Sequence, residues 1–135
     1  MRYLEVACAI IEGDGRVLAA QRSAAMSLPL KWEFPGGKIG SGETPAECLY
    51  RELREELGVE VAILRAIPVA SHRYPDIAVT LHPFVCVLIG GKLCMHEHAA
   101  LLWLLPEELA GLDWAEADLP IVAEYCRERR EGGVL

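Results

Sequence analysis

The sequence feature that most restricts how this chain can fold is a strongly specified helix with a glycine-rich segment directly before it. Thr44 is a good N-cap, Pro45 suits the first helical position, and Glu47 completes a capping box. Gly58 stands where a left-handed residue closes a helix, so we expect a helix close to 45–57. Every fourth residue along it is apolar and predicts a buried stripe: Leu49, Leu53 and Leu57.

This helix carries three carboxylates on neighbouring positions, where like charges oppose one another: Glu52, Glu55 and Glu56. One explanation is a solvated face on which Arg51 and Arg54 act as counterions. The other is a site for a hard divalent cation such as Mg²⁺, which carboxylates share with the phosphate oxygens of a substrate. The glycine-rich segment favours the second explanation, because its backbone can approach phosphates closely.

The rest of the chain predicts a β-rich domain with one more long helix. A hairpin around Asp14-Gly15 and a pair of strands joined by Gly90-Gly91 follow from turn signals. A short helix is expected from Pro106 and an amphipathic helix over 119–131. The expected strands are 3–11, 17–20, 32–34, 59–67, 68–73, 77–89, 92–95 and 100–105.

Composition excludes several classes of protein. The 135 residues fit one domain (1–135), and 53% hydrophobic residues disfavour disorder. A net charge of −7 argues against a nucleic-acid polymer as partner. We expect no membrane span, because apolar runs are far shorter than the roughly 20 residues required, and Glu5 interrupts the only candidate signal sequence. Five cysteines without a C-x-x-C pair predict reduced thiols and a cytoplasmic location.

The segment from Gly37 to Val59 carries a recognisable motif. It matches the Nudix box, G-x5-E-x7-R-E-U-x-E-E-x-G-U with U aliphatic, at all nine specified positions. The chain therefore resembles the Nudix hydrolase superfamily over the box at 37–59. Residues 32–38 are similar to the segment before the box in MutT-type enzymes. The tail from His96 resembles the CTP pyrophosphohydrolase branch.

The resemblance implies an α/β (α+β) Nudix fold, with a mixed β-sheet sandwiched between helices. It also implies a hydrolase that uses Mg²⁺, with Mn²⁺ as a possible substitute, and acts on a nucleoside triphosphate. Water would attack the β-phosphorus and release a nucleoside monophosphate and pyrophosphate. The implied role is removal of damaged or surplus nucleotides, with 8-oxo-dGTP or a cytidine triphosphate as the expected substrate.

The same resemblance assigns roles to residues of the box. Glu43 and Arg51 would pair and hold the loop against the helix. Glu52 would also orient or deprotonate the attacking water, although crowded carboxylates leave the identity of the base open. The metal ligands would be the carbonyl of Gly36 and the side chains of Glu52, Glu55 and Glu56.

One further carboxylate lies outside the box. Glu97 matches in position an additional metal ligand of MutT enzymes, and the alternative is a plain surface glutamate. A zinc cluster is a competing interpretation of the same segment, but C-x-H-x-H lacks a usual structural spacing. Its ligands would be Cys94, His96 and His98.

Substrate contacts are less specified than the box. Arg22 and Lys38 are expected to contact phosphates, against the alternative of ordinary surface cations. Phe34 and Tyr74 are expected to wall the base pocket, against the alternative of core packing. Asp118 stands where MutT has an asparagine that reads the base; the alternative is a cap for the helix after it. Three more side chains are interpreted as structural or surface residues: His72, Arg73 and His82.

Two other functions remain as alternatives. The chain could be a Nudix hydrolase of another nucleoside diphosphate derivative, such as a nucleotide sugar or a dinucleoside polyphosphate. It could also be a nucleotide-sensing module without catalysis, which predicts a damaged box. The sequence allows either a monomer or a homodimer.

Overall fold

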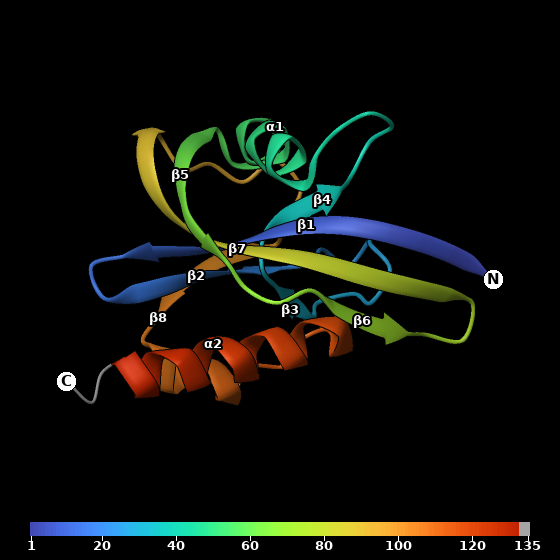
Figure 1. Ribbon diagram of the computed structural model, residues 1–135. Coiled ribbons are helices and arrows are strands. Elements are labelled where there is room, and N and C mark those ends of the chain that lie inside the picture. The colour runs from blue at the N-terminus through green and yellow to red at the C-terminus, as the bar shows by residue number, and fades with distance from the viewer. Residues whose placement is uncertain (133–135) are drawn as a thin grey trace.

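The computed structural model describes residues 1–132 and forms a mixed sheet with one helix on each side (Figure 1). Helix α1 (Pro45–Leu57) covers one face and α2 (Leu119–Gly132) the other. Short 3-10 helices, Pro106–Gly111 and Glu116–Asp118, lead into α2. The strands are β1 (Arg2–Gly13), β2 (Arg16–Gln21), β3 (Trp32–Glu33), β4 (Gly36–Lys38), β5 (Val59–Ala66), β6 (Ala70–Arg73), β7 (Ile77–Gly91) and β8 (Ala100–Leu104). The predicted α+β class, with the sheet between helices, is confirmed.

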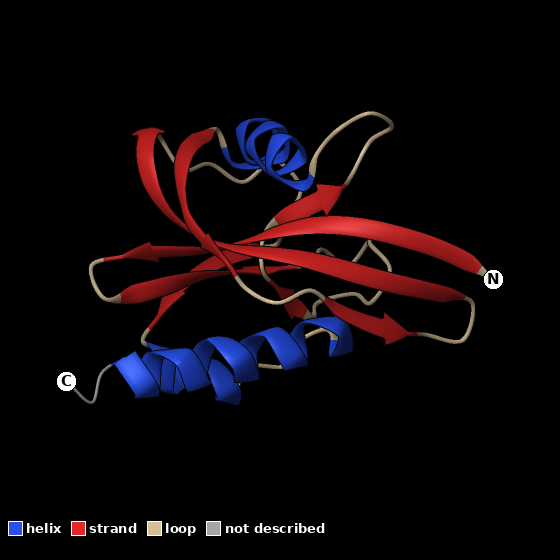
Figure 2. Ribbon diagram, in the orientation of Figure 1, coloured by secondary structure: helices blue, strands red, loops and turns tan. Residues whose placement is uncertain are grey.

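The centre of the sheet is a parallel pair of long strands. β1 and β7 pair from Arg2 opposite Ile77 to Glu12 opposite Val87, and the main path is β3-β2-β1-β7-β5. β4 adds to β1, β6 to β7 and β8 to β2, all in antiparallel fashion (Figure 2). Because parallel strands cannot be joined by a tight turn, α1 and β5 lie in the connection between β1 and β7.

Both faces of the central strand are buried, which explains its continuous apolar sequence. Successive side chains of a strand point to opposite faces. Ala9 and Ile11 of β1 pack in the cluster under α1, whereas Cys8 and Ile10 pack in the cluster under α2. The sheet is thus held by helices on both sides, which fixes the positions of the strand ends that build the site.

Helix α1 forms as its sequence predicts. The Thr44 hydroxyl accepts the backbone N–H of Glu47 at 3.1 Å, the Glu47 carboxylate accepts that of Thr44 at 2.9 Å, and Gly58 closes the helix with φ 69°. Burying each leucine of the apolar stripe contributes roughly 1.5–3 kcal/mol. These leucines are at most 1% exposed: Leu49, Leu53 and Leu57. The packed stripe turns the opposite, charged face of the helix outward.

Strand β4 is a feature that the sequence analysis did not predict. Gly36 and Gly37 pair with Cys8 and Ala7 of β1 instead of forming only a loop. A Cβ on Gly36 would lie 1.9 Å from the carbonyl oxygen of Ala7. The absence of a side chain therefore lets the chain lie flat against β1 and delivers the next residues to α1.

The prediction of a strand at 92–95, joined to 77–89 by a Gly90-Gly91 turn, is wrong. Both glycines belong to β7, where Gly91 pairs with Val59. A Cβ on Gly91, whose φ is 82°, would lie 2.3 Å from the carbonyl oxygen of Gly58. The glycine therefore serves a close backbone approach to the end of α1, and the following segment is a loop without strand pairing.

The remaining elements follow the predictions with small shifts of their ends. Asp14 and Gly15, both with positive φ, turn β1 into β2 as a tight hairpin. The short helix from Pro106 is a 3-10 helix. All five cysteines are free, and three of them are buried. Neither α1 nor α2 is both long and apolar enough to cross a membrane.

Candidate active site

Arg51 is the centre of a charged network that ties α1 to the loop before it. Its Nε and Nη2 donate to the two carboxylate oxygens of Glu43 at 2.6 and 2.9 Å. Glu43 also accepts the backbone N–H of Gly40 at 2.7 Å. The hydrogen bonds from Arg51 and Gly40 lower the pKa of Glu43 to about 2. The structure therefore forms the expected pair of Glu43 and Arg51, in a bidentate geometry that fixes the loop.

The same guanidinium compensates two of the three helix carboxylates. Nη1 of Arg51 donates to Glu52 at 2.9 Å and to Glu55 at 3.3 Å. Arg54, the other expected counterion, donates to Glu60 of β5 at 2.6 Å instead. A solvated face neutralised by both arginines therefore does not describe this helix.

Glu52 lies against the glycine-rich strand. Its side chain is only 14% exposed. A Cβ on Gly37 would lie 2.3–2.6 Å from the carboxylate carbon and oxygens of Glu52. Any side chain at this position would occupy the place of that carboxylate. Gly37 is thus required by close approach, and it leaves a carboxylate beside a bare segment of backbone.

Glu56 is the helix carboxylate with the most perturbed environment. Burial raises its pKa to about 7, and the charges of Glu52 and Glu97 act in the same direction while His98 opposes them. Glu97 comes from the distant loop between β7 and β8 and is exposed. Its charge acts on Glu56 together with that of Glu52.

The chemistry of these groups fits a hard divalent cation. Carboxylate oxygens are the ligands that Mg²⁺ prefers, and the bare backbone at Gly37 lets the Glu52 carboxylate lie against it. A positive charge would relieve the repulsion that raises the pKa of Glu56. In residues 1–132 no three potential ligand side chains already converge on one point. Binding of an ion therefore requires the glutamate side chains to turn toward it.

The zinc cluster does not form. Sγ of Cys94 lies 3.2 Å from Nε2 of His96, but His98 points elsewhere and binds Glu33 at 2.9 Å. The two histidines therefore have different partners, and the three residues of the zinc interpretation do not converge in this structure.

Three residues expected at the base pocket lie together. Phe34 donates its backbone N–H to Oδ2 of Asp118 at 2.9 Å, and the Tyr74 hydroxyl accepts the N–H of Ala117 at 3.0 Å. The ring of Phe34 is 2% exposed and packs on Trp114, with centroids 4.7 Å apart. Tyr74 is partly buried. The backbone around Phe34 is therefore near Asp118, while the Phe34 ring belongs to the core.

Asp118 has a role that the sequence did not reveal. Its carboxyl accepts the backbone N–H of Phe34, directly after β3, and not one from the helix that follows it, so the cap interpretation is not what the structure shows. Burial raises its pKa to about 8, against the lowering effect of the bond from Phe34. At neutral pH the group is largely protonated, and it then both donates and accepts hydrogen bonds.

The two expected phosphate contacts differ in their surroundings. The Arg22 guanidinium donates to Glu33 Oε1 at 2.7 Å, to the Ser27 carbonyl at 2.6 Å and to the Ser27 hydroxyl at 3.0 Å. Lys38 is exposed at the end of β4, and its carbonyl accepts from Arg51. Arg22 is thus part of the scaffold, whereas the ammonium of Lys38 stays at the surface.

Glu33 and His98 are site residues whose roles the sequence analysis missed. Glu33 accepts from Arg22 with one oxygen and binds His98 with the other. The available signal was a charged residue inside the apolar segment Trp32 to Phe34. Of the three residues interpreted as structural or surface residues, His72 binds Glu116, His82 binds Glu5, and Arg73 is exposed.

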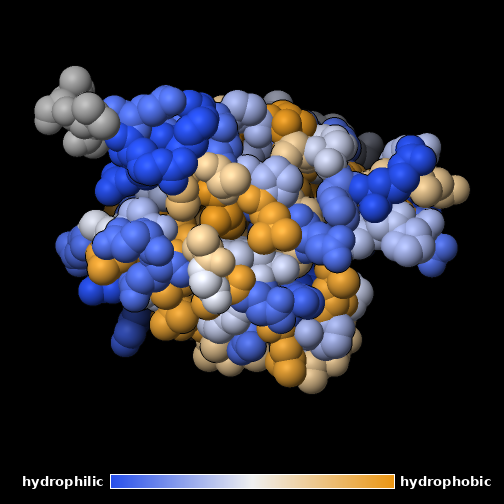
Figure 3. Space-filling view, turned by 90° about the horizontal axis from the view of Figure 1, so that it is seen from below, coloured by the Kyte–Doolittle hydropathy of each residue, from blue (hydrophilic) through white to orange (hydrophobic). Residues whose placement is uncertain are grey.

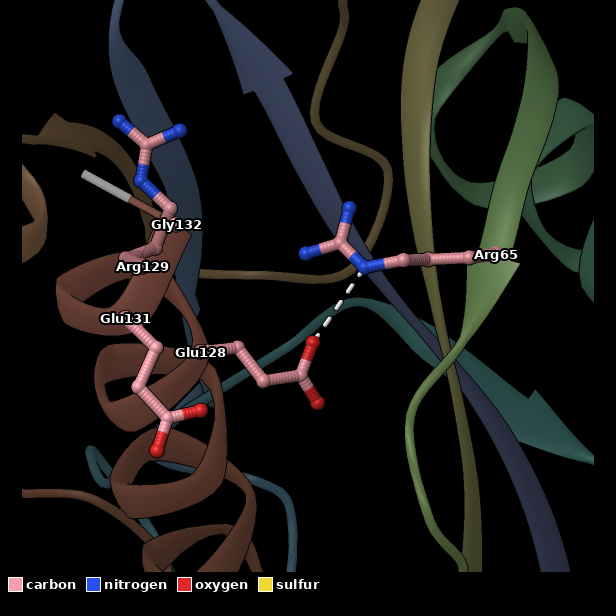
Figure 4. A pocket seen from close by; sticks show the side chains of 5 residues that line it. All are labelled: Arg65, Glu128, Arg129, Glu131 and Gly132. Carbon is pink, nitrogen blue, oxygen red and sulfur yellow. Dashed lines mark hydrogen bonds and ion pairs between the residues drawn. The ribbon is translucent and has the colours of Figure 1, made fainter. Parts of the chain in front are cut away.

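The other side of the molecule has a groove that contains none of the predicted site residues. It has a volume of about 760 Å³ and is lined by residues of β5 and of the last turns of α2 (Figure 4). Arg65 and Glu128 bridge it at 3.3 Å. Seen from below, hydrophilic residues gather at this end of α2 (Figure 3). Two arginines and two glutamates line it, so the groove has no excess of either sign.

The fold and the carboxylate cluster together define a class of protein: a hydrolase domain that presents glutamates of one helix beside a glycine-rich strand. The sequence profile of the NUDIX domain matches residues 1–125. The chain belongs to the NUDIX domain family.

Relatives and a solved structure agree with this assignment. The chain is 38% identical over 129 residues to the CTP pyrophosphohydrolase of Escherichia coli K12, covering 96% of each chain. It is 40% identical over 131 residues to the putative 8-oxo-dGTP diphosphatase 2 of Mycobacterium tuberculosis H37Rv, covering 94% of this chain and 90% of the relative. The crystal structure of a MutT protein from Methanosarcina mazei Go1 superimposes with a TM-score of 0.85 at 22% identity, covering 95% and 96%.

Proposed function

We propose that this protein is a Mg²⁺-dependent nucleoside triphosphate pyrophosphohydrolase of the MutT type. The observation that supports this most is Arg51 of α1, which holds Glu52 against the bare backbone of Gly37. The names of the relatives, which are pyrophosphohydrolases and diphosphatases of nucleoside triphosphates, support the substrate class. The products are a nucleoside monophosphate and pyrophosphate.

The side chains divide the work of this reaction. Glu52, Glu55, Glu56 and Glu97 are the proposed metal ligands, with the carbonyl of Gly36 as a further one. A bound Mg²⁺, or Mn²⁺ in its place, would supply neutralisation of phosphate charge and so make the β-phosphorus more electrophilic. Arg51 holds Glu52 at 2.9 Å and keeps its carboxylate in a fixed position. Fixed negative groups then need little reorganisation as charge develops in the transition state.

A carboxylate of the cluster removes the proton of the attacking water. Glu52 is in position to orient that water beside the bare backbone of Gly37. Burial raises the pKa of Glu56 to about 7. A general base works best when its pKa lies near the operating pH. Because neighbouring carboxylates titrate as a coupled group, either of these two glutamates can act as the base.

The nucleobase of the substrate is proposed to contact the residues around Asp118. Asp118 lies under β3 with Phe34 and Tyr74 near it, and its protonated carboxyl can donate to a base and accept from it. The ring edges of a cytosine and of an oxidised guanine offer different patterns of donors and acceptors, and a buried polar group discriminates between them. We propose 8-oxo-dGTP or a cytidine triphosphate as the preferred substrate, with Lys38 at the phosphates.

The site favours catalysis over sensing alone, because the glutamates of the box and their arginine partner are all in place. We propose that the enzyme is a single domain and acts in the cytoplasm as a monomer or homodimer. The five free thiols fit a reducing compartment.

A nucleotide panel tests the proposal. Canonical and oxidised nucleoside triphosphates are incubated with Mg²⁺, and pyrophosphate and orthophosphate are measured separately. We expect pyrophosphate from at least one triphosphate, with Glu52→Gln as the inactive control. Orthophosphate release, or activity on nucleotide sugars alone, would reject the MutT-type assignment and leave a different hydrolase of the same family.

A further inference from the structure

His98 is a buried histidine with one partner and one unpartnered nitrogen. It is 8% exposed, and its Nε2 lies 2.9 Å from Oε2 of Glu33 on β3. Glu33 is held from its other side by Arg22, the residue directly after β2, at 2.7 Å. Within residues 1–132, Nδ1 of His98 is the buried side-chain nitrogen or oxygen without a hydrogen-bond partner. A histidine is seldom buried in this way without a structural or functional reason.

The position of His98 in the chain connects it to the carboxylate cluster. It follows Glu97 directly, in the loop between β7 and β8. The backbone of this loop is fixed by Cys94, whose N–H binds the Leu57 carbonyl at 3.0 Å, and by Ala99, whose N–H binds the Gln21 carbonyl at 2.8 Å. Between these two anchors the residues are exposed, except for His98. His98 is therefore the side chain that fastens the middle of the loop to the sheet.

The charges around the imidazole place it between the scaffold and the cluster. The carboxylates of Glu33 and Glu56 both act on the imidazole, Glu33 through a hydrogen bond and Glu56 through its charge. One carboxylate thus belongs to the scaffold and the other to the proposed metal site. Because His98 directly follows Glu97, movement of the imidazole away from Glu33 would also move Glu97 relative to Glu56.

We propose that His98 is a positioning residue, which sets the place of Glu97 at the metal site through the chain Arg22–Glu33–His98. This inference rests on the proposed function only in taking Glu97 as a metal ligand. The imidazole donates through Nε2 to the Glu33 carboxylate, and this bond sets the loop against β3. Residues that orient metal ligands affect metal affinity by about 10–100-fold when they are replaced.

The geometry gives a matched set of variants. In His98→Gln the side-chain amide can place its N–H₂ near the position of Nε2, whereas His98→Leu removes the donor at similar size. His98→Asn is polar but too short to reach Glu33, and it replaces His98→Leu if that variant does not fold. His82→Leu is the control, because His82 also binds a glutamate, Glu5 at 3.0 Å, in a pair unconnected with the cluster.

The experiment measures Mn²⁺ affinity by electron paramagnetic resonance on the full chain without nucleotide. Each His98 variant is also made in a Glu97→Gln background. We expect His98→Leu to weaken Mn²⁺ binding by about tenfold or more, and His98→Gln to stay within about threefold of the parent. Because His98 acts through Glu97, His98→Leu should add no further loss in the Glu97→Gln background. Melting temperatures check that each variant is folded.

Other results would overturn the proposal. A folded His98→Leu that binds Mn²⁺ like the parent removes the positioning role, as does a loss equal to that of His82→Leu. An additive loss in the Glu97→Gln background shows that His98 acts elsewhere, and unchanged affinity in Glu97→Gln itself shows that Glu97 is not a ligand. Because this readout needs no substrate, the inference can hold even if the nucleotide panel rejects the proposed reaction.

Discussion

The two sides of the candidate site are held together in different ways. In the loop–helix segment (residues 36–58), Arg51 and Glu43 are eight positions apart, and the capping bonds of Thr44 and Glu47 span three. In the cross-strand cluster (Glu33, Phe34, Tyr74, His98 and Asp118), Phe34 and Asp118 are 84 positions apart, and His98 and Glu33 are 65 apart. The first segment is largely ionic, whereas the second is partly to fully buried. The glutamates of α1 are thus positioned by nearby sequence, whereas the cross-strand cluster depends on the whole sheet.

The largest expected effect concerns the loop–helix segment. Glu52→Gln keeps the size of the side chain but removes a ligand or base, so turnover should fall by about 100-fold or more. The fold should remain, because one repulsive charge on α1 is lost. Turnover is measured at saturating Mg²⁺, with Glu60→Gln of β5 as the matched control. Equal turnover for Glu52→Gln and the parent would remove Glu52 from the chemistry.

The cross-strand cluster should respond to pH in its stability. Asp118 has a folded pKa of about 8, above its ordinary value of 3.8. Between these values the folded chain holds a proton that the unfolded chain releases, so the stability contributed by the protonated group is lost as pH rises. The unfolding free energy of the parent relative to Asp118→Asn should fall by roughly 2–3 kcal/mol from pH 5 to pH 7. Urea titrations measure it, and parallel curves for the two proteins would show an ionised Asp118.

The same substitution should change substrate selection. The Asn amide has a fixed donor and acceptor, whereas the Asp118 carboxyl changes its pattern with its proton. The ratio of kcat/KM between 8-oxo-dGTP and CTP should therefore change by about tenfold, because a mismatched buried polar group costs about 1–3 kcal/mol. Steady-state kinetics on the nucleotide panel measure this ratio. Equal small changes for all substrates would leave Asp118 as a scaffold residue.

The smallest effect is expected at Cys94. Its thiol is exposed, and the zinc cluster is absent because His98 binds Glu33. Cys94→Ser should leave turnover within about twofold of that of the parent and should leave the melting temperature unchanged, as surface substitutions usually do. Activity and melting temperature are measured with and without a chelator of zinc. A variant that unfolds, or a parent that needs added zinc, would support the interpretation of this segment as a zinc site.

The sequence predicted the loop–helix segment well because its determinants are local. Thr44, Glu47 and Gly58 each carry out the role that their position indicates, and Arg51 meets Glu43 through the helix itself. The hairpin at Asp14 and the two helices follow from equally local signals. Strand β4 was missed because glycines indicate a loop unless another strand is known to lie beside them.

The cross-strand cluster was predicted only in part, since its residues meet through the fold. Phe34 and Asp118 were both identified, but the buried bond between them and the resulting pKa of Asp118 depend on β3 lying over the start of α2. Glu33 looked like an ordinary charge in a short strand. Gly91 was interpreted as a turn, because the chain end of α1 that it approaches is distant in sequence.

The most direct test of the proposed reaction is the position of solvent oxygen in the products. The preferred triphosphate is hydrolysed in water enriched in ¹⁸O with Mg²⁺, and the products are examined by mass spectrometry. Water directed to the β-phosphorus by the carboxylates of α1 should place the label in pyrophosphate and leave the nucleoside monophosphate unlabelled. Label in the monophosphate, or formation of a nucleoside diphosphate and labelled orthophosphate, would contradict this mechanism.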